Sequence, residues 1–171
     1  MTKVQKVGES SEFSRELFSL KLARIEEFPE FLVLPSPHFA LFLAWDARDL
    51  PAEVIHRFAV SSIQQGLVYC CVWGPDSKRV HDIFDHVIFE RDPQATDYSN
   101  IPTTWHEYEK LDDALWFFLN NTFPADKYAN TCLSSLAVVV GNDQWVAQIN
   151  TGLADPMTLL KRTEQSNACN G

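Results

Sequence analysis

The stretch FALFLAWDARDLPAEVIHRFAVSSIQQGLVYCCVW, residues 39–73, decides the fold. It begins with a continuous apolar run, residues 39–45, and ends with a second one, residues 67–73. Apolar runs of this length, bounded by turn residues, are typical of strands covered on both faces. Between them, apolar residues recur at helical spacing from Val54 to Ile63 and stop at Gly66. The stretch therefore predicts strand, helix and strand, the unit of a parallel sheet.

A further helix is predicted directly after the second strand. Residues 74–76 (GPD) predict a turn, and Ser77 is the expected N-cap of a helix that continues to about residue 85 or 86. Residues 87–90 fit either the end of this helix or a third short strand, and the pattern leaves both open.

The second half of the chain is predicted to contain four more elements. They are a brief strand at 103–106, a helix at 111–121 and a β-hairpin with strands at 136–140 and 145–149. In the second hairpin strand apolar and polar residues alternate, so only one of its faces is expected to be buried. The polar residues 155–171 predict a loose tail.

The N-terminal residues 1–30 are predicted to be a helical extension of a single domain that spans residues 1–154. Within residues 12–27 apolar side chains recur at roughly helical spacing with charges between them. Residues 31–34 predict a short strand, which a proline-rich turn closes.

These elements together predict an α/β fold. We expect a three-layer sandwich, Rossmann-like in the loose sense, whose mixed sheet has a parallel centre and the C-terminal β-hairpin. Ligands of such sheets bind at the carboxyl ends of the strands. Here those ends carry Asp46, the loop 74–77 and residues 103–106.

The charge balance narrows the classes of partner. The chain has 14 basic and 23 acidic residues, a formal net charge of −9, and no basic stripe. A nucleic-acid ligand is therefore disfavoured, whereas a basic protein partner or a homo-oligomer is compatible with this surface. No apolar run has the length of a signal peptide core or a membrane span, so we expect no membrane association.

The four cysteines indicate the compartment. Their positions, 70, 71, 132 and 169, match no zinc-binding spacing. Cys70 and Cys71 lie inside an apolar run, where a thiol behaves as a small buried hydrophobe in a reducing environment. We expect a cytoplasmic protein without a cofactor.

Gly74, Ser77 and Lys78 are the candidate ligand-binding residues, because they join a strand to a helix N-terminus. Free N–H groups, a hydroxyl and a cation at such a place can hold a phosphate or carboxylate. The segment has one glycine and matches no phosphate-binding fingerprint, and Asp76 would repel an anion. A turn followed by an N-cap is the interpretation we favour.

The candidate metal ligands are His81, Asp85 and His86, in a segment that also contains Asp82. His81 and Asp85 are four residues apart, as are Asp82 and His86, so each pair can share an ion on a helix. The apolar residues of the same helix occupy the opposite side, however. A solvated helix face is therefore the favoured interpretation.

The candidate catalytic residues are His106, Thr104 and Asp46. Strand alternation places Thr104 and His106 on the same side, where a general base would lie near a hydroxyl. Because no serine or cysteine nucleophile motif accompanies them, a structural histidine is favoured.

Trp116 and Phe117 are the candidate partner-binding residues. They fall on the flanks of the apolar stripe of their helix, which contains Leu115 and Phe118. Large aromatic side chains off the stripe indicate either burial on two sides or a contact surface for a partner.

The strings WGPDSKRVHDIFD, TTWH, LDDALWFFLNNTFPAD and LAVVVGNDQWVAQI resemble a family of small uncharacterised bacterial proteins, a domain of unknown function. The resemblance covers about residues 39–150. It implies a single α/β domain and a bacterial cytoplasmic origin, and it assigns no catalytic residue.

Three functions are compatible with these features. The first is a non-catalytic interaction protein, accessory or immunity-type, that binds a protein partner. The second is a small-molecule enzyme or a nucleotide- or phosphate-ligand binder that uses the strand-end crevice. The third is a metal enzyme. The sequence favours them in this order.

Overall fold

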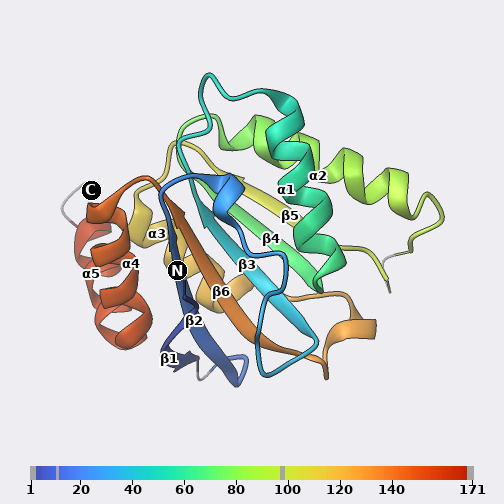
Figure 1. Ribbon diagram of the computed structural model, residues 1–171. Coiled ribbons are helices and arrows are strands. Elements are labelled where there is room, and N and C mark those ends of the chain that lie inside the picture. The colour runs from blue at the N-terminus through green and yellow to red at the C-terminus, as the bar shows by residue number, and fades with distance from the viewer. Residues whose placement is uncertain (1–2, 11, 97–98, 169–171) are drawn as a thin grey trace.

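The computed structural model describes residues 3–10, 12–96 and 99–168 (Figure 1). Within them a six-stranded sheet has the order β1-β2-β6-β3-β4-β5. The strands are β1 (Gln5–Ser10), β2 (Arg15–Leu22), β3 (His38–Ala44), β4 (Leu67–Trp73), β5 (Thr103–His106) and β6 (Cys132–Val140). The edge strand β1 is antiparallel to β2, and the other neighbours pair in parallel. The predicted mixed sheet with a parallel centre is confirmed.

Helices cover both faces of the sheet. One face carries α1 (Ala52–Gln64), α2 (Ser77–Arg91) and the short 3-10 helix η1 (Ile25–Glu27). The other face carries α3 (Leu111–Asn121), α4 (Asp143–Ala154) and α5 (Pro156–Ala168), and η2 (Asp126–Tyr128) precedes β6. Figure 1 shows α1 and α2 together on one side and α4 and α5 on the other. The predicted three-layer α/β sandwich is therefore confirmed.

The alternation of β3 between two cores explains its continuous apolar run. Phe39, Leu41 and Leu43 pack into the core beneath α1 and α2. Phe42 and its alanine neighbours pack into the core beneath α3, where the rings of Phe42 and Phe118 lie 5.4 Å apart. Because both faces of the strand are covered, residues 39–44 are apolar without interruption.

The predicted C-terminal hairpin is wrong, because residues 145–149 belong to helix α4. The Asn142 side chain caps this helix by accepting a hydrogen bond from the Trp145 N–H at 3.0 Å. Ile149 and Leu153 are buried in the core under α4. Two apolar residues four positions apart lie on the same face of a helix, and they also lie on the same face of a strand, so a short segment fits both structures. The Asn142 cap favours the helix. The antiparallel pair of the sheet is β1–β2 instead.

The helix predicted within residues 12–27 is also wrong, because β2 occupies this segment. Leu17 packs into one core and Leu20 into the other, as expected for a strand covered on both sides. The residue spacing also fits a helix, which explains the error. The strand predicted at 31–34 is absent: these residues lie outside the sheet.

Two further segments are helical, one that the sequence pattern left open and one that it predicted as a loose tail. Helix α2 continues to Arg91, so residues 87–90 are helical. The predicted loose tail contains α5, which begins at Pro156 and buries Leu159, while residues 169–171 lie outside the described residues. Asp155 supports its start by accepting from the Thr158 N–H at 3.1 Å. Among the described residues, none of the helices is long and apolar enough to span a membrane.

Candidate functional site

The connections of the sheet change direction at β3. The chain leaves β3 through α1 to β4, which is its neighbour on one side. Its neighbour on the other side, β6, is reached through α3, which lies on the opposite face. Such a reversal separates the loops that follow the two strands, and ligands of open α/β sheets bind in the gap outside the carboxyl ends.

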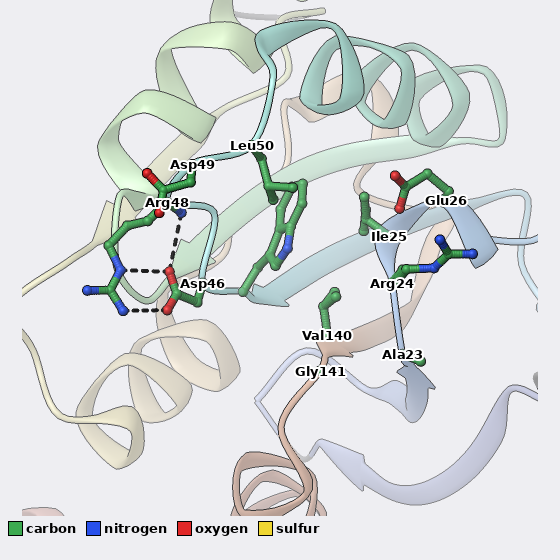
Figure 2. A pocket seen from close by; sticks show the side chains of 11 residues that line it. Ala23, Arg24, Ile25, Glu26, Asp46, Arg48, Asp49, Leu50, Val140 and Gly141 are labelled. Carbon is green, nitrogen blue, oxygen red and sulfur yellow. Dashed lines mark hydrogen bonds and ion pairs between the residues drawn. The ribbon is translucent and has the colours of Figure 1, made fainter.

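A hollow of about 600 Å³ lies at this place (Figure 2). Its lining comes from the segments that follow β2, β3 and β6, namely Ala23, Arg24, Ile25, Glu26, Trp45, Asp46, Arg48, Asp49, Leu50, Val140 and Gly141. We call it the switch-point crevice. Its volume is within the range of roughly 300–1,000 Å³ that is usual for small-molecule sites.

The crevice has an apolar floor and a charged rim. Ile25, Trp45 and Val140 are almost wholly buried, so they present only small apolar areas to the hollow. Figure 2 shows Arg24 and Glu26 on one side of the hollow, and Asp46 and Arg48 on the other. A ligand bound there would meet apolar surface at its centre and charges at its ends.

Asp46 is held by an ion pair within its own loop. The Arg48 side chain donates to both carboxylate oxygens, from Nε at 2.9 Å and from Nη2 at 2.6 Å. The hydrogen bonds from Arg48 lower the pKa of Asp46, because they favour the charged carboxylate. Asp46 thus stays ionised, with both oxygens already accepting.

Arg79, which lies outside the crevice, fixes the loop that carries Asp46. Its guanidinium donates to the carbonyls of Ala47 at 2.6 Å and Leu50 at 3.1 Å, and to the Asp76 carboxylate at 2.6 Å. A single planar group thereby joins the β3–α1 loop to the start of α2. Sequence reasoning did not find this role, because two of the three acceptors are backbone carbonyls about 30 residues away in the chain.

Thr104 and His106 lie on one side of β5 and contact each other. His106 is 6% exposed, and its Nε2 is 3.4 Å from the Thr104 hydroxyl. The Nδ1 atom is 2.8 Å from the Glu109 carboxylate, and the ring packs against Phe117 at 4.7 Å. The sequence did not indicate a role for Glu109, because this residue lies in a loop that contains no recognisable motif. Hydroxyl, imidazole and carboxylate are thus in series, which is an arrangement that can relay a proton.

The cluster of Thr104, His106 and Glu109, which we call the His106 cluster, does not reach Asp46. Strand β4 separates β5 from β3, so the two sites are two strand spacings apart, roughly 10 Å. The same cluster includes buried groups of β4. Burial raises the pKa of Tyr69 to about 12 and that of Cys71 to about 12, so neither side chain ionises near neutral pH.

The candidate metal ligands do not converge on one point. His81 is buried against the ring of Trp105, 4.5 Å away, and lies 3.5 Å from Asp85. His86 is exposed and pairs with Glu90 at 3.2 Å. The expectation that His81 lies on a solvated face is wrong, because the edge strand β5 covers it. Within the part of the chain that the structure describes, no group of three or more His, Cys, Asp or Glu side chains is placed to hold a metal ion.

The lining of the crevice does not include Gly74, Ser77 or Lys78. The N-cap of α2 is Asp76, in the left-handed conformation, rather than the predicted Ser77. Gly74 approaches the backbone of Trp45, and Lys78 pairs with Asp82 at 2.7 Å.

The candidate partner-binding residues Trp116 and Phe117 are both half-buried. Each packs against the core beneath α3, which takes up part of its ring surface. The area that these two side chains offer to a partner is therefore smaller than their position off the stripe suggests.

Residues 18–156 match the model of a protein family described as Domain of unknown function (DUF7684). The match covers most of the chain and confirms the resemblance to an uncharacterised family. The comparison with curated proteins finds no match.

Proposed function

The chain belongs to the family of the domain of unknown function DUF7684, and we propose that it binds a small molecule in the switch-point crevice. The observation that carries the proposal is the position of the hollow, outside the carboxyl ends of β2, β3 and β6 where the connections reverse. This is the place where open α/β sheets bind ligands. The charged rim supplies specificity, and the floor adds a small apolar contact area.

The rim favours a ligand that carries no negative charge. The lining has two arginines, Arg24 and Arg48, and three carboxylates, those of Glu26, Asp46 and Asp49, so its formal net charge is −1. Asp46 already neutralises Arg48. The whole chain, lining included, carries a formal net charge of −9. We propose a ligand with an apolar body and a neutral or cationic polar group.

Three probes that differ only in their polar group test this proposal. They are 2-phenylethylamine, 2-phenylethanol and phenylacetate, each titrated into ¹⁵N-labelled protein while the amide resonance of Gly141 is followed. We expect saturable shifts, with the amine binding about thirtyfold tighter than the acid, because these two probes differ by two unit charges and each unit charge near the rim is worth about 1 kcal/mol in water. The alcohol should lie between them.

A rim variant is the control for the charge effect. Combining Glu26→Gln with Asp49→Asn removes two exposed carboxylates from the lining and leaves the floor intact. The amine should lose its advantage, while the affinity for the alcohol stays the same. If none of the three compounds moves the Gly141 resonance, or if the acid binds best, the proposal is wrong.

A protein partner is the second candidate function, and one exposed segment favours it. Phe31 and Val33 are 85% and 83% exposed, whereas Leu32 and Leu34 point inward and pack against the core. Large apolar side chains presented in this way are typical of contact surfaces. Trp116 and Phe117 remain the alternative surface, with less free area.

Native mass spectrometry of untagged protein from its own cells tests the second candidate. A protein retained by the wild type should be lost from the double variant Phe31→Ser, Val33→Ser, because the exposed side chains make no core contact that the change would break. The double variant Trp116→Ala, Phe117→Ala probes the alternative surface. If the gently purified wild type retains no protein, the second candidate is wrong.

A further inference from the structure

A second hollow adjoins the switch-point crevice. It has a volume of about 320 Å³ and lies between η1 and α1. Its lining includes Phe28, directly after η1, and Val54, Arg57 and Phe58 of α1. Ile25 and Glu26 line both this hollow and the crevice, so the two hollows meet at these residues. We call the second one the side hollow.

The side hollow offers the apolar surface that the crevice lacks. In the crevice, the apolar residues of the floor are almost wholly buried and leave little area for a ligand. Phe28 and Val54, by contrast, are half-buried, so each keeps part of its apolar surface open to solvent. The ring of Phe28 packs edge-on against that of Phe58, 4.9 Å away, which holds it in place. An apolar group that covers Phe28 and Val54 would therefore be stabilised by leaving water.

The charges place the polar end of a ligand in the crevice. Apart from the shared Glu26, the charged residue of the side hollow is Arg57, which would repel a cationic group. The crevice, whose lining is acidic overall, carries Asp46 and Asp49 on the side opposite Glu26 (Figure 2). The carboxylate of Asp46 is already paired with Arg48, and that of Asp49 lies in the same loop. A cationic or neutral polar group is thus favoured at this far side, and an apolar group toward Arg57.

We infer that the ligand of the switch-point crevice is an elongated amphiphile whose apolar tail passes Ile25 and Glu26 and lies in the side hollow. The inference rests on the proposed function and adds the chemical class of the ligand to it. The polar head lies on the side of Asp49, and the tail covers Phe28 and Val54. A compound confined to the crevice would leave this apolar surface in water.

Two probes with the same ammonium group test the inference. 2-Phenylethylamine has no tail, and 2-(4-butylphenyl)ethylamine has a butyl tail at the opposite end of the ring. Each is titrated into wild-type protein, while the Gly141 amide reports on the crevice and the Val54 methyl groups report on the side hollow. The short amine should shift the Gly141 resonance alone. The long amine should shift both and bind about tenfold tighter, because part of its tail leaves water.

Val54→Trp fills the side hollow and should abolish the gain in affinity from the tail, while the affinity for 2-phenylethylamine stays at the wild-type level. Val60→Trp is the matched control. Val60 is also a half-buried valine of α1 that packs against the same core, and it lines neither hollow. It should keep the full gain from the tail.

The outcomes separate this inference from the proposed function. If both amines bind with equal affinity, or if a folded Val54→Trp keeps the gain, the crevice binds a ligand but the inference is wrong. A long amine that shifts the Val54 methyl groups without the Gly141 amide also overturns it, because the hollows would then be separate sites. If neither amine binds, the proposed function fails as well. Should Val54→Trp not fold, the two wild-type resonances and affinities decide.

Discussion

Replacing Arg15 by methionine is expected to lower the free energy of unfolding by about 3–4 kcal/mol, because buried acceptors lose their donor. Arg15 is 3% exposed and lies at the start of β2. It donates to the Cys132 carbonyl at 3.1 Å, to the Thr122 hydroxyl at 3.1 Å and to the Thr122 carbonyl at 3.0 Å. Urea unfolding followed by tryptophan fluorescence measures the loss.

The size of this effect follows from what Arg15 connects. Its three acceptors lie after the end of α3 and at the start of β6, so one side chain fastens β2 to both. Methionine restores most of the volume and none of the donors. The ring of Phe13 covers the guanidinium at 4.3 Å, so water cannot easily replace the lost bonds.

Arg57→Met is the matched control for Arg15→Met. Arg57 is an exposed residue of α1, and the same change there should stay within about 0.5 kcal/mol of the wild type. Arg15→Lys keeps a positive charge but cannot reach three acceptors with a planar fork, so it should lie between the wild type and the methionine variant. A loss below about 1 kcal/mol in Arg15→Met would show that the buried carbonyls find other donors.

The elements that could be predicted from sequence are those whose local pattern of apolar residues fits only one type of secondary structure. The two apolar runs of β3 and β4 are too short for buried helices and end in turn residues, and both strands are confirmed. In β2 and α4 the spacing of the apolar residues fits both the period of a helix and the period of a strand. Their structure is decided by tertiary packing and, for α4, by the Asn142 cap, which the hairpin interpretation treated as part of a turn.

The candidate site was predictable to the extent that it rests on strand ends. Asp46 follows a confirmed strand and lines the crevice as the carboxyl-end rule predicts. Arg24 and Glu26 follow β2. Because a helix was wrongly predicted in this segment, these two residues of the rim were not expected at a strand end. Arg79 acts on carbonyls about 30 residues away, and no spacing along the sequence indicates such contacts.

Gly74→Ala is expected to destabilise the protein by about 4 kcal/mol, the second large effect. Gly74 has a φ of +119°, which residues with a Cβ rarely adopt, and an added Cβ would lie 2.5 Å from the Trp45 carbonyl oxygen. The substitution must therefore push apart the ends of β3 and β4, where the Trp45 N–H donates to the Trp73 carbonyl at 3.1 Å. Thermal and urea unfolding measure the loss.

Gly141→Ala separates the two causes of this loss. Gly141 also has a positive φ, of +72°, but the nearest atom to an added Cβ is the Ala23 carbonyl oxygen at 3.6 Å, an ordinary contact. Only the conformational cost of about 1–2 kcal/mol should appear there. The excess loss in Gly74→Ala then measures the close approach of the two strand ends. Equal losses of unfolding free energy in both variants would mean that the backbone at Trp45 can move away from an added Cβ without a loss of stability. The loop that carries Asp46 would then be more flexible than its hydrogen bonds indicate.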